Sequence, residues 1–165
     1  MKKHLCVRTW AQVILVLLLA MILSFAATGF AEETTCYVFC DPDSFVTIRS
    51  EPKRKSVEVG GATFGSELKT DGKIRNGYLH VYDLAAEEDE GWISTGYIVY
   101  DPPRITSYKA LVVSNGKLTA RKSIGGKMKK MLRPMTEVKV FCESDEWCLT
   151  NYGYVMTDFL ETVGE

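Results

Sequence analysis

The sequence predicts an all-β protein made of two small β-barrels in tandem after an N-terminal signal peptide. Short runs alternate apolar and polar residues, as at Val138 and Val140 with their charged neighbours, which is typical of a half-buried strand. Turn-forming pairs such as Asn115-Gly116 separate runs rich in Tyr, Val, Ile, Thr and Trp. Three sequence blocks also occur twice in the same order. After the N-terminal segment, no stretch carries the apolar stripe of an amphipathic helix.

The repeat sets the predicted domain boundaries. Residues 37–49 align with residues 109–121 without a gap, at a spacing of 72 residues, which places Cys40 opposite Val112. Two further blocks follow in each copy: 76–81 and 91–98 in the first, 145–150 and 153–160 in the second. We therefore expect domain 1 at 35–101, a linker at 102–106 that contains two prolines, and domain 2 at 107–161. Five or six short strands in each copy favour a closed barrel, which leaves no exposed sheet edge.

The N-terminus has the pattern of a secretory signal peptide. Val13–Ala27 is an almost unbroken apolar run that follows three basic residues, and Gly29 and Ala31 suit a cleavage site after Ala31. Residues 1–31 are thus predicted to be removed, with the rest extracellular or associated with the cell wall. The alternative is an uncleaved membrane anchor, because Ala11–Ala31 is about 20 residues, just long enough to cross a bilayer.

Charge is unevenly divided between the two copies. Residues 35–101 carry 7 basic and 12 acidic residues, whereas residues 104–161 carry 10 and 6. The first copy is acidic and the second basic, and the excess of acid in the whole mature chain does not favour nucleic acid as a partner.

Three blocks in each copy resemble the bacterial SH3-like domain family. The family's units begin with a motif of the form L-N-V-R-S-G-P, continue with G-W-x-x-V and end with G-Y-V-x-x-x-Y-L. The sequence departs from it at Glu51, where the family has Gly, and at Ile124, where it has Pro near a Gly. The matching segments are Val46–Pro52, Asn76–Val81 and Gly91–Ile98 in the first copy, and Leu118–Ile124, Glu146–Thr150 and Gly153–Leu160 in the second.

The resemblance implies attachment rather than catalysis. Such units accompany cell-wall hydrolases and surface proteins, and they often bind peptidoglycan. The expected function is therefore a secreted, non-catalytic module that binds peptidoglycan or an associated wall polymer, with no cofactor and no stable membrane insertion after cleavage. The alternative is a module that binds another extracellular protein. Fold alone does not decide between them.

The sequence gives little support to an enzyme. His80 is the only histidine after the signal segment, it lies in a strand-like block, and no nucleophile motif accompanies it. No metal site is expected either, because the cysteine spacings do not match a zinc knuckle and the acidic residues near 83–90 lack the pattern of a calcium loop.

Four cysteines remain after signal removal, an even number that suggests disulfides in an oxidising compartment. Cys142 and Cys148 flank a predicted turn, and a three-residue loop would place them opposite each other, close enough to bridge. We predict that disulfide. The pairing of Cys36 and Cys40 stays open, since a straight strand would place their Cα atoms about 13 Å apart.

Aromatic residues are the candidates for ligand binding. By comparison with peptide-binding SH3 domains, Tyr78 and Trp147 fall at the groove tryptophan, and Tyr97 and Phe159 at the late groove tyrosine. All four have an alternative place in the core, which we favour for Phe159. Trp147 is the strongest candidate, because its hairpin position leaves one ring face for a ligand.

Overall fold

The computed structural model describes residues 33–82, 84 and 89–163, and residues 33–165 form one compact unit. The predicted signal peptide, with its alternative as an anchor, lies outside the described residues. Within these residues the protein is all-β, as predicted: it has no α-helix, and its only helical turns are η1 (Thr95–Tyr97) and η2 (Thr157–Phe159). No helix in this part of the chain has the length and apolar character needed to span a membrane.

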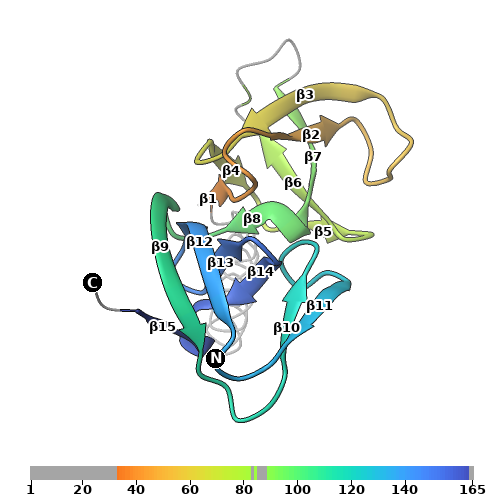
Figure 1. The fold of residues 1–165 in the computed structure, drawn as a ribbon. Coiled ribbons are helices and arrows are strands. Elements are labelled where there is room, and N and C mark those ends of the chain that lie inside the picture. The colour runs from red at the N-terminus through yellow and green to blue at the C-terminus, as the bar shows by residue number, and fades with distance from the viewer. Residues whose placement is uncertain (1–32, 83, 85–88, 164–165) are drawn as a thin grey trace, which may run out of the picture. The chain divides into compact units, whose positions relative to one another are not determined.

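The strands form two antiparallel sheets (Figure 1). The first sheet contains β1 (Thr34–Val38), β2 (Phe45–Arg49), β3 (Glu58–Thr63), β4 (Glu67–Thr70), β5 (Ile74–Arg75), β6 (Tyr78–Tyr82), β7 (Glu90–Ser94) and β8 (Ile98–Val99). The second contains β9 (Arg104–Val112), β10 (Leu118–Arg121), β11 (Met128–Leu132), β12 (Glu137–Glu143), β13 (Trp147–Thr150), β14 (Gly153–Met156) and β15 (Leu160–Thr162).

Both sheets have the same strand order, which is the structural form of the sequence repeat. The first runs β3-β2-β7-β6-β4-β1-β8, with β5 paired to β6, and the second runs β11-β10-β14-β13-β12-β9-β15. Each strand of the second sheet therefore has a counterpart in the first. Most of the acidic residues near 83–90 come before β7 and lie outside the described part.

Neither sheet closes into a barrel, so the expectation of closed barrels is not met. In each hydrogen-bonded order the two end strands, β3 and β8 or β11 and β15, stay unpaired on their outer sides among the described strands. β11 is exposed at four of its five residues, and β3 at three of its six. The exposed residues along these edges include Glu58, Gly61 and Thr63 on β3 and Lys129 and Lys130 on β11. Charged residues, especially lysine, are typical of strands that stay at an open sheet edge.

The alternation seen in the sequence defines the buried faces. Along β12, Val138, Val140 and Cys142 are buried, whereas Glu137 and Lys139 are exposed. This is the pattern of a strand with one face on a core. Each sheet encloses its own apolar cluster in this way, centred on Leu79, Val81 and Ile93 in the first sheet and on Val112, Val140 and Val155 in the second.

A third apolar cluster joins the two sheets. Phe39 and Val99 from the first sheet pack with Cys142, Leu149 and Tyr154 from the second. The Tyr154 hydroxyl donates a hydrogen bond of 3.2 Å to the Phe39 carbonyl, which is buried. The two sheets thus share core residues, which is why residues 33–165 form one unit.

Two details of the predicted organisation are wrong. The first is the ungapped alignment: equivalent hydrogen bonds relate Val38, rather than Cys40, to Val112, so the loop after β1 is two residues longer in the first copy. The second is the linker at 102–106. Strand β9 begins at Arg104, because this long strand pairs with both β12 and β15.

Candidate functional site

The four aromatic residues predicted for ligand binding line two hollows of the protein surface. Tyr78 and Tyr97 line hollow 1, which has a volume of about 560 Å³. Trp147 and Phe159 line hollow 2, which has a volume of about 370 Å³. The structure therefore brings the predicted residues together in pairs, one pair from each repeat.

Equivalent elements position the two pairs. Tyr78 begins β6 and Trp147 begins β13, which are counterparts in the two sheets. Tyr97 and Phe159 end the counterpart turns η1 and η2. In both copies the first residue of the turn donates a backbone hydrogen bond of 3.0 Å to the residue that precedes the aromatic strand. The same local fold thus sets the same spacing of aromatic side chains twice.

The equivalence extends over the whole of hollow 2, since each of its ten lining residues has a counterpart in hollow 1. The pairs, with the hollow 1 residue first, are Cys40 and Ser114, Asp41 and Asn115, Ser44 and Gly116, Phe45 and Lys117, Val46 and Leu118, Thr47 and Thr119, Arg49 and Arg121, Tyr78 and Trp147, Ser94 and Met156, and Tyr97 and Phe159.

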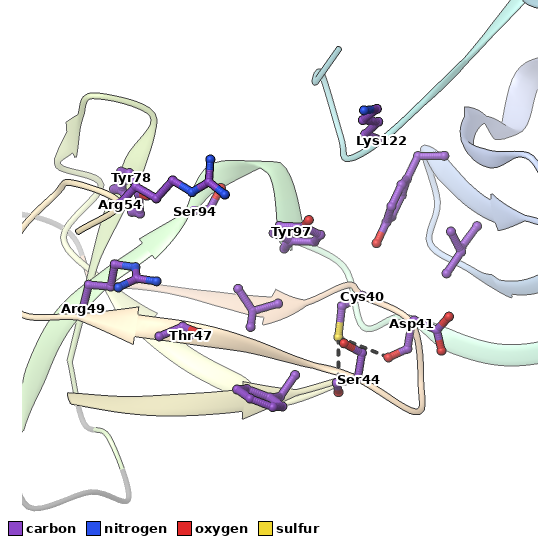
Figure 2. Close-up of a pocket in the computed structure, with 14 residues that line it drawn as sticks. Cys40, Asp41, Ser44, Thr47, Arg49, Arg54, Tyr78, Ser94, Tyr97 and Lys122 are labelled. Atoms are coloured by element: carbon purple, nitrogen blue, oxygen red, sulfur yellow. Dashed lines mark hydrogen bonds between the residues drawn. The ribbon is translucent and has the colours of Figure 1, made fainter. Parts of the chain in front are cut away.

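Hollow 1 is extended by residues that have no counterpart in hollow 2. Arg54 adds a cation from the first sheet, and Lys122, Leu149 and Tyr154 reach it from the second. Figure 2 shows Arg54 and Lys122 toward opposite sides of the view, with Tyr97 between them. Hollow 1 therefore lies between the two sheets, whereas residues of the second sheet alone line hollow 2.

The cations of the two hollows differ in what they contact. The Arg49 guanidinium donates to the Ser56 carbonyl at 3.0 Å and lies 3.3 Å from the Glu58 carboxylate. Its counterpart Arg121 donates to the Gly126 carbonyl at 2.9 Å. These two arginines are committed to holding their own loops. By contrast, Arg54 and Lys122 are exposed and have no acidic partner within 4.0 Å among the described residues.

Trp147 lies where the sequence predicts it, whereas Phe159 does not. Trp147 is half-buried: it packs against the cluster shared by the two sheets and also lines hollow 2. Phe159, which we expected in the core, is exposed over 37% of its surface. The turn η2 carries Phe159 out of the apolar cluster, and the following residue, Leu160, packs against that cluster instead.

The predicted Cys142–Cys148 disulfide is not formed, and all four cysteines of the described residues are free and buried. In the strand register Cys148 lies opposite Glu143, and Cys142 lies opposite Leu149. The loop between the paired residues has four residues rather than three. Because a slip of one residue turns a side chain to the other face of a strand, Cys142 enters the shared cluster while Cys148 enters the core of the second sheet.

Burial also lowers the reactivity of the Cys36 and Cys142 thiols. It raises the pKa of Cys36 to about 11 and that of Cys142 to about 12. For Cys142 the neighbouring Asp41 carboxylate and Cys40 thiol add to the effect. A thiol that stays protonated is a poor nucleophile and a poor metal ligand.

His80 lies on the first sheet between two carboxylates, away from both hollows. Its Nδ1 atom is 3.2 Å from Asp71 and its Nε2 atom is 3.5 Å from Glu90, and its ring packs on Trp92 at 5.0 Å. The Nδ1 contact is an ion-pair distance without hydrogen-bond geometry. No nucleophile joins this group, and among the described residues no three His, Cys, Asp or Glu side chains form a cluster that suits a metal ion.

Asp71 is the electrostatic centre of this group. Burial opposes its ionisation, but hydrogen bonds from the side chain and backbone of Lys73 and the contact with His80 outweigh that effect and lower its pKa to about 2. The Lys73 ammonium lies 2.6 Å from the carboxylate. The arrangement stabilises the loop that joins β4 to β5.

Sequence reasoning missed the residues that make hollow 1 distinct. Arg54 lies in a loop that the repeat does not cover, and Lys122 and Tyr154 come from the second copy. The extra cation beside Arg121 was visible in the sequence, but nothing in the sequence indicated that it faces the first copy. Contacts between the two copies are tertiary contacts, and the periodic pattern of the sequence does not predict them.

Comparison with known proteins adds little. No family model and no curated protein matches the chain. The structures of NlpC1 and NlpC2 from Trichomonas vaginalis are similar to it, with 16% and 14% sequence identity and TM-scores of 0.36 and 0.37. The alignments cover 82% and 81% of this chain, which spans about half of those chains, 48% and 49%. At this level the likeness supports no functional conclusion.

Proposed function

We propose that the chain is an exported, non-catalytic binding protein with two tandem SH3-like domains, and that hollows 1 and 2 bind cell-wall material. The observation that supports it best is the pair of equivalent hollows. Each presents two aromatic side chains held by the same strand and turn, and a repeated ligand is the natural partner of a repeated site. Binding through both hollows raises avidity on a polymer without high affinity at either one.

Charge supports the same proposal. The second copy carries four more basic than acidic residues, and four of these cations are Lys127, Lys129, Lys130 and Arg133. Walls that carry anionic groups attract such a surface at low salt, and added salt screens the attraction over about 10 Å at 0.1 M.

Export places the hollows on the side of the membrane where wall polymer lies. We expect cleavage after Ala31, because Gly29 and Ala31 supply the small residues that a signal peptidase requires. N-terminal sequencing of the protein from the culture medium should begin at Glu32. A protein that stays in the membrane with Met1 intact would contradict export by cleavage.

The binding proposal is tested by co-sedimentation of the protein with purified cell walls at low and high salt. We expect sedimentation at low salt that weakens as salt is added, and no clearing of a zymogram that contains the same walls. Wall clearing would overturn the non-catalytic assignment. A protein that stays in the supernatant at low salt would overturn wall binding and favour an extracellular protein as the partner.

A further inference from the structure

Hollow 1 carries a charge pattern that hollow 2 lacks. Two exposed cations, Arg54 and Lys122, line it from different sheets, and neither has an acidic partner among the described residues. The hydrogen bonds of Arg49 and Arg121 relate Ser56 to Gly126, so Arg54 lies in a loop that is two residues longer in the first copy. In the first copy the position of Lys122 corresponds to Ser50. The two cations thus line one hollow only because the two copies pack together.

Two cations in one hollow, without acidic partners among the described residues, favour an anionic ligand. Both are at the protein surface, where water weakens a single ion pair to about 1 kcal/mol or less. A ligand anion that reaches both cations, with charge-assisted hydrogen bonds from the guanidinium, is bound more strongly, and the guanidinium selects a carboxylate or phosphate. Arg49 also lines the hollow and adds positive potential, although its guanidinium already donates to Ser56 and Glu58.

Asp41 decides which kind of anion is favoured. It lines the same hollow, it is exposed, and its Oδ1 accepts a hydrogen bond of 3.1 Å from the Asp43 N–H. Figure 2 places Asp41 on the lower side of the view and Lys122 on the upper side. A polymer with negative charge at every repeat would be repelled by this carboxylate. A ligand with both an anionic and a cationic group would satisfy both sides.

The tyrosines favour a flat, peptide-like body for that ligand. Tyr78 and Tyr97 are half-buried in the hollow and offer ring surface to it. Tyr154 stiffens the wall, because its hydroxyl is bound to the Phe39 carbonyl and its ring packs edge-on against Phe39 at 5.7 Å and against Tyr97 at 6.3 Å. Rigid aromatic surface of this kind binds at a low cost in conformational entropy.

We infer that hollow 1 binds a short zwitterionic peptide, with its carboxylate between Arg54 and Lys122 and its amino group facing Asp41. The inference rests on the proposed function in that the peptide portion of the cell wall would supply such a ligand. Hollow 2, with Asn115 in place of Asp41 and without the two cations, would contribute contacts of a more apolar kind.

The test is a chemical-shift titration of the exported protein with Nα-acetyl-lysyl-D-alanine, which has one carboxylate and one amine. We expect shifts at residues of hollow 1. The C-terminal amide, and separately the norleucine analogue that lacks the amine, should each bind about tenfold more weakly, as expected for the loss of one charge-assisted hydrogen bond. Poly(glycerol phosphate), an anion without an amine, serves as the competing probe.

Substitutions locate the effect. Arg54→Gln together with Lys122→Gln should remove the preference for the free carboxylate, and Asp41→Asn the preference for the amine. Lys55→Gln, an exposed lysine next to Arg54 in the sequence that lines neither hollow, is the matched control and should change neither preference. All of these side chains are exposed, so the variants should keep the thermal midpoint of the parent.

Three outcomes would overturn the inference: no binding of the dipeptide, equal binding of acid and amide, or tighter binding of poly(glycerol phosphate) in hollow 1. Its failure is distinct from failure of the proposed function. A protein that sediments with walls but ignores the dipeptide refutes only the inference. A protein that binds the dipeptide but not walls refutes only the wall-binding proposal.

Discussion

The burial of each cysteine side chain determines whether its thiol can react. Cys36, Cys142 and Cys148 have no exposed surface, and Cys40 is 3% exposed. Their places in three different apolar clusters follow from strand register, so each thiol acts as a small apolar side chain. Burial, rather than a disulfide bridge, therefore protects these four thiols.

We therefore predict that Cys36, Cys40, Cys142 and Cys148 are protected from iodoacetamide in the native protein at pH 8. All four should be alkylated once the protein is unfolded in guanidinium without any reductant. Mass spectrometry of peptides from the two samples measures this residue by residue. If Cys142 and Cys148 were recovered as a linked pair, the four-residue loop and its register would be wrong.

At the scale of elements, the repeated glycine that begins each third block has a structural reason. Gly153 on β14 has a φ of +121°, and a Cβ at this position would clash with the Arg121 carbonyl on β10. A Cβ on its counterpart Gly91 would clash with the side chain of Ile48 on β2. In both sheets the glycine lets two strands cross closely where only one residue pair joins them.

Gly153→Ala should therefore destabilise the protein by about 2–4 kcal/mol, from backbone strain and from the displacement of β10. Gly116→Ala is the control, because no atom lies within 4 Å of its added Cβ, and it should change the free energy of unfolding by less than about 1 kcal/mol. Urea denaturation of both variants measures the difference. Equal stability of the two variants would show that the strands do not cross as described.

The group around Asp71 makes a prediction about pH. Its pKa falls to about 2 in the folded state, below its ordinary value, so the ionised form stabilises the fold above that ordinary value. This stabilisation is lost as the pH falls toward 2. Asp71→Asn should thus be less stable than the parent at pH 7, and the difference should vanish near pH 2. Thermal midpoints of both proteins across this range test it, and a difference independent of pH would contradict the ionic account.

A feature of the fold can be predicted from the sequence when it depends on residues that are close together in the chain, and less well when it depends on distant ones. Local alternation predicts the hairpin of β12 and β13, and the repeated blocks predict the shared strand order. Strand register is harder to predict from the sequence. The loop between the paired residues of β12 and β13 has one residue more than predicted, so Cys148 lies opposite Glu143 instead of Cys142. The loop after β1 has two residues more than its counterpart, so Val38 and not Cys40 corresponds to Val112. The open sheet edges and the presence of Arg54 and Lys122 in one hollow depend on contacts between distant segments, so no local pattern in the sequence reports them.

The same distinction applies to the candidate site. Tyr78, Tyr97, Trp147 and Phe159 follow from the repeated blocks, because a conserved spacing between strand and turn carries them to the same place in each copy. Phe159 was harder to assign to the surface, since an aromatic residue followed by leucine at the end of a sheet reads equally well as core. The 3₁₀ turn, which sends Phe159 outward and Leu160 inward, settles the choice.

At the scale of the whole molecule, the packing of two copies creates what neither copy has alone. Phe39, Leu149 and Tyr154 form a buried contact between the sheets, and hollow 1 lies beside it. The arrangement gives one wide, charged hollow and one narrower, more apolar hollow from a single repeated unit. A polymer that occupies both would be held by two weak sites whose spacing is fixed by that shared core.

The most direct test of the account measures the affinity for purified walls of Tyr78→Ala, Trp147→Ala and the double variant, with Trp92→Ala as a control outside both hollows. We expect each single variant to bind the walls at least about tenfold more weakly, because it loses one of the two binding sites that together raise avidity. The double variant should stay in the supernatant, and Trp92→Ala should sediment like the parent. A double variant that keeps its thermal midpoint and still sediments as well as the parent would contradict the claim that these hollows bind the wall.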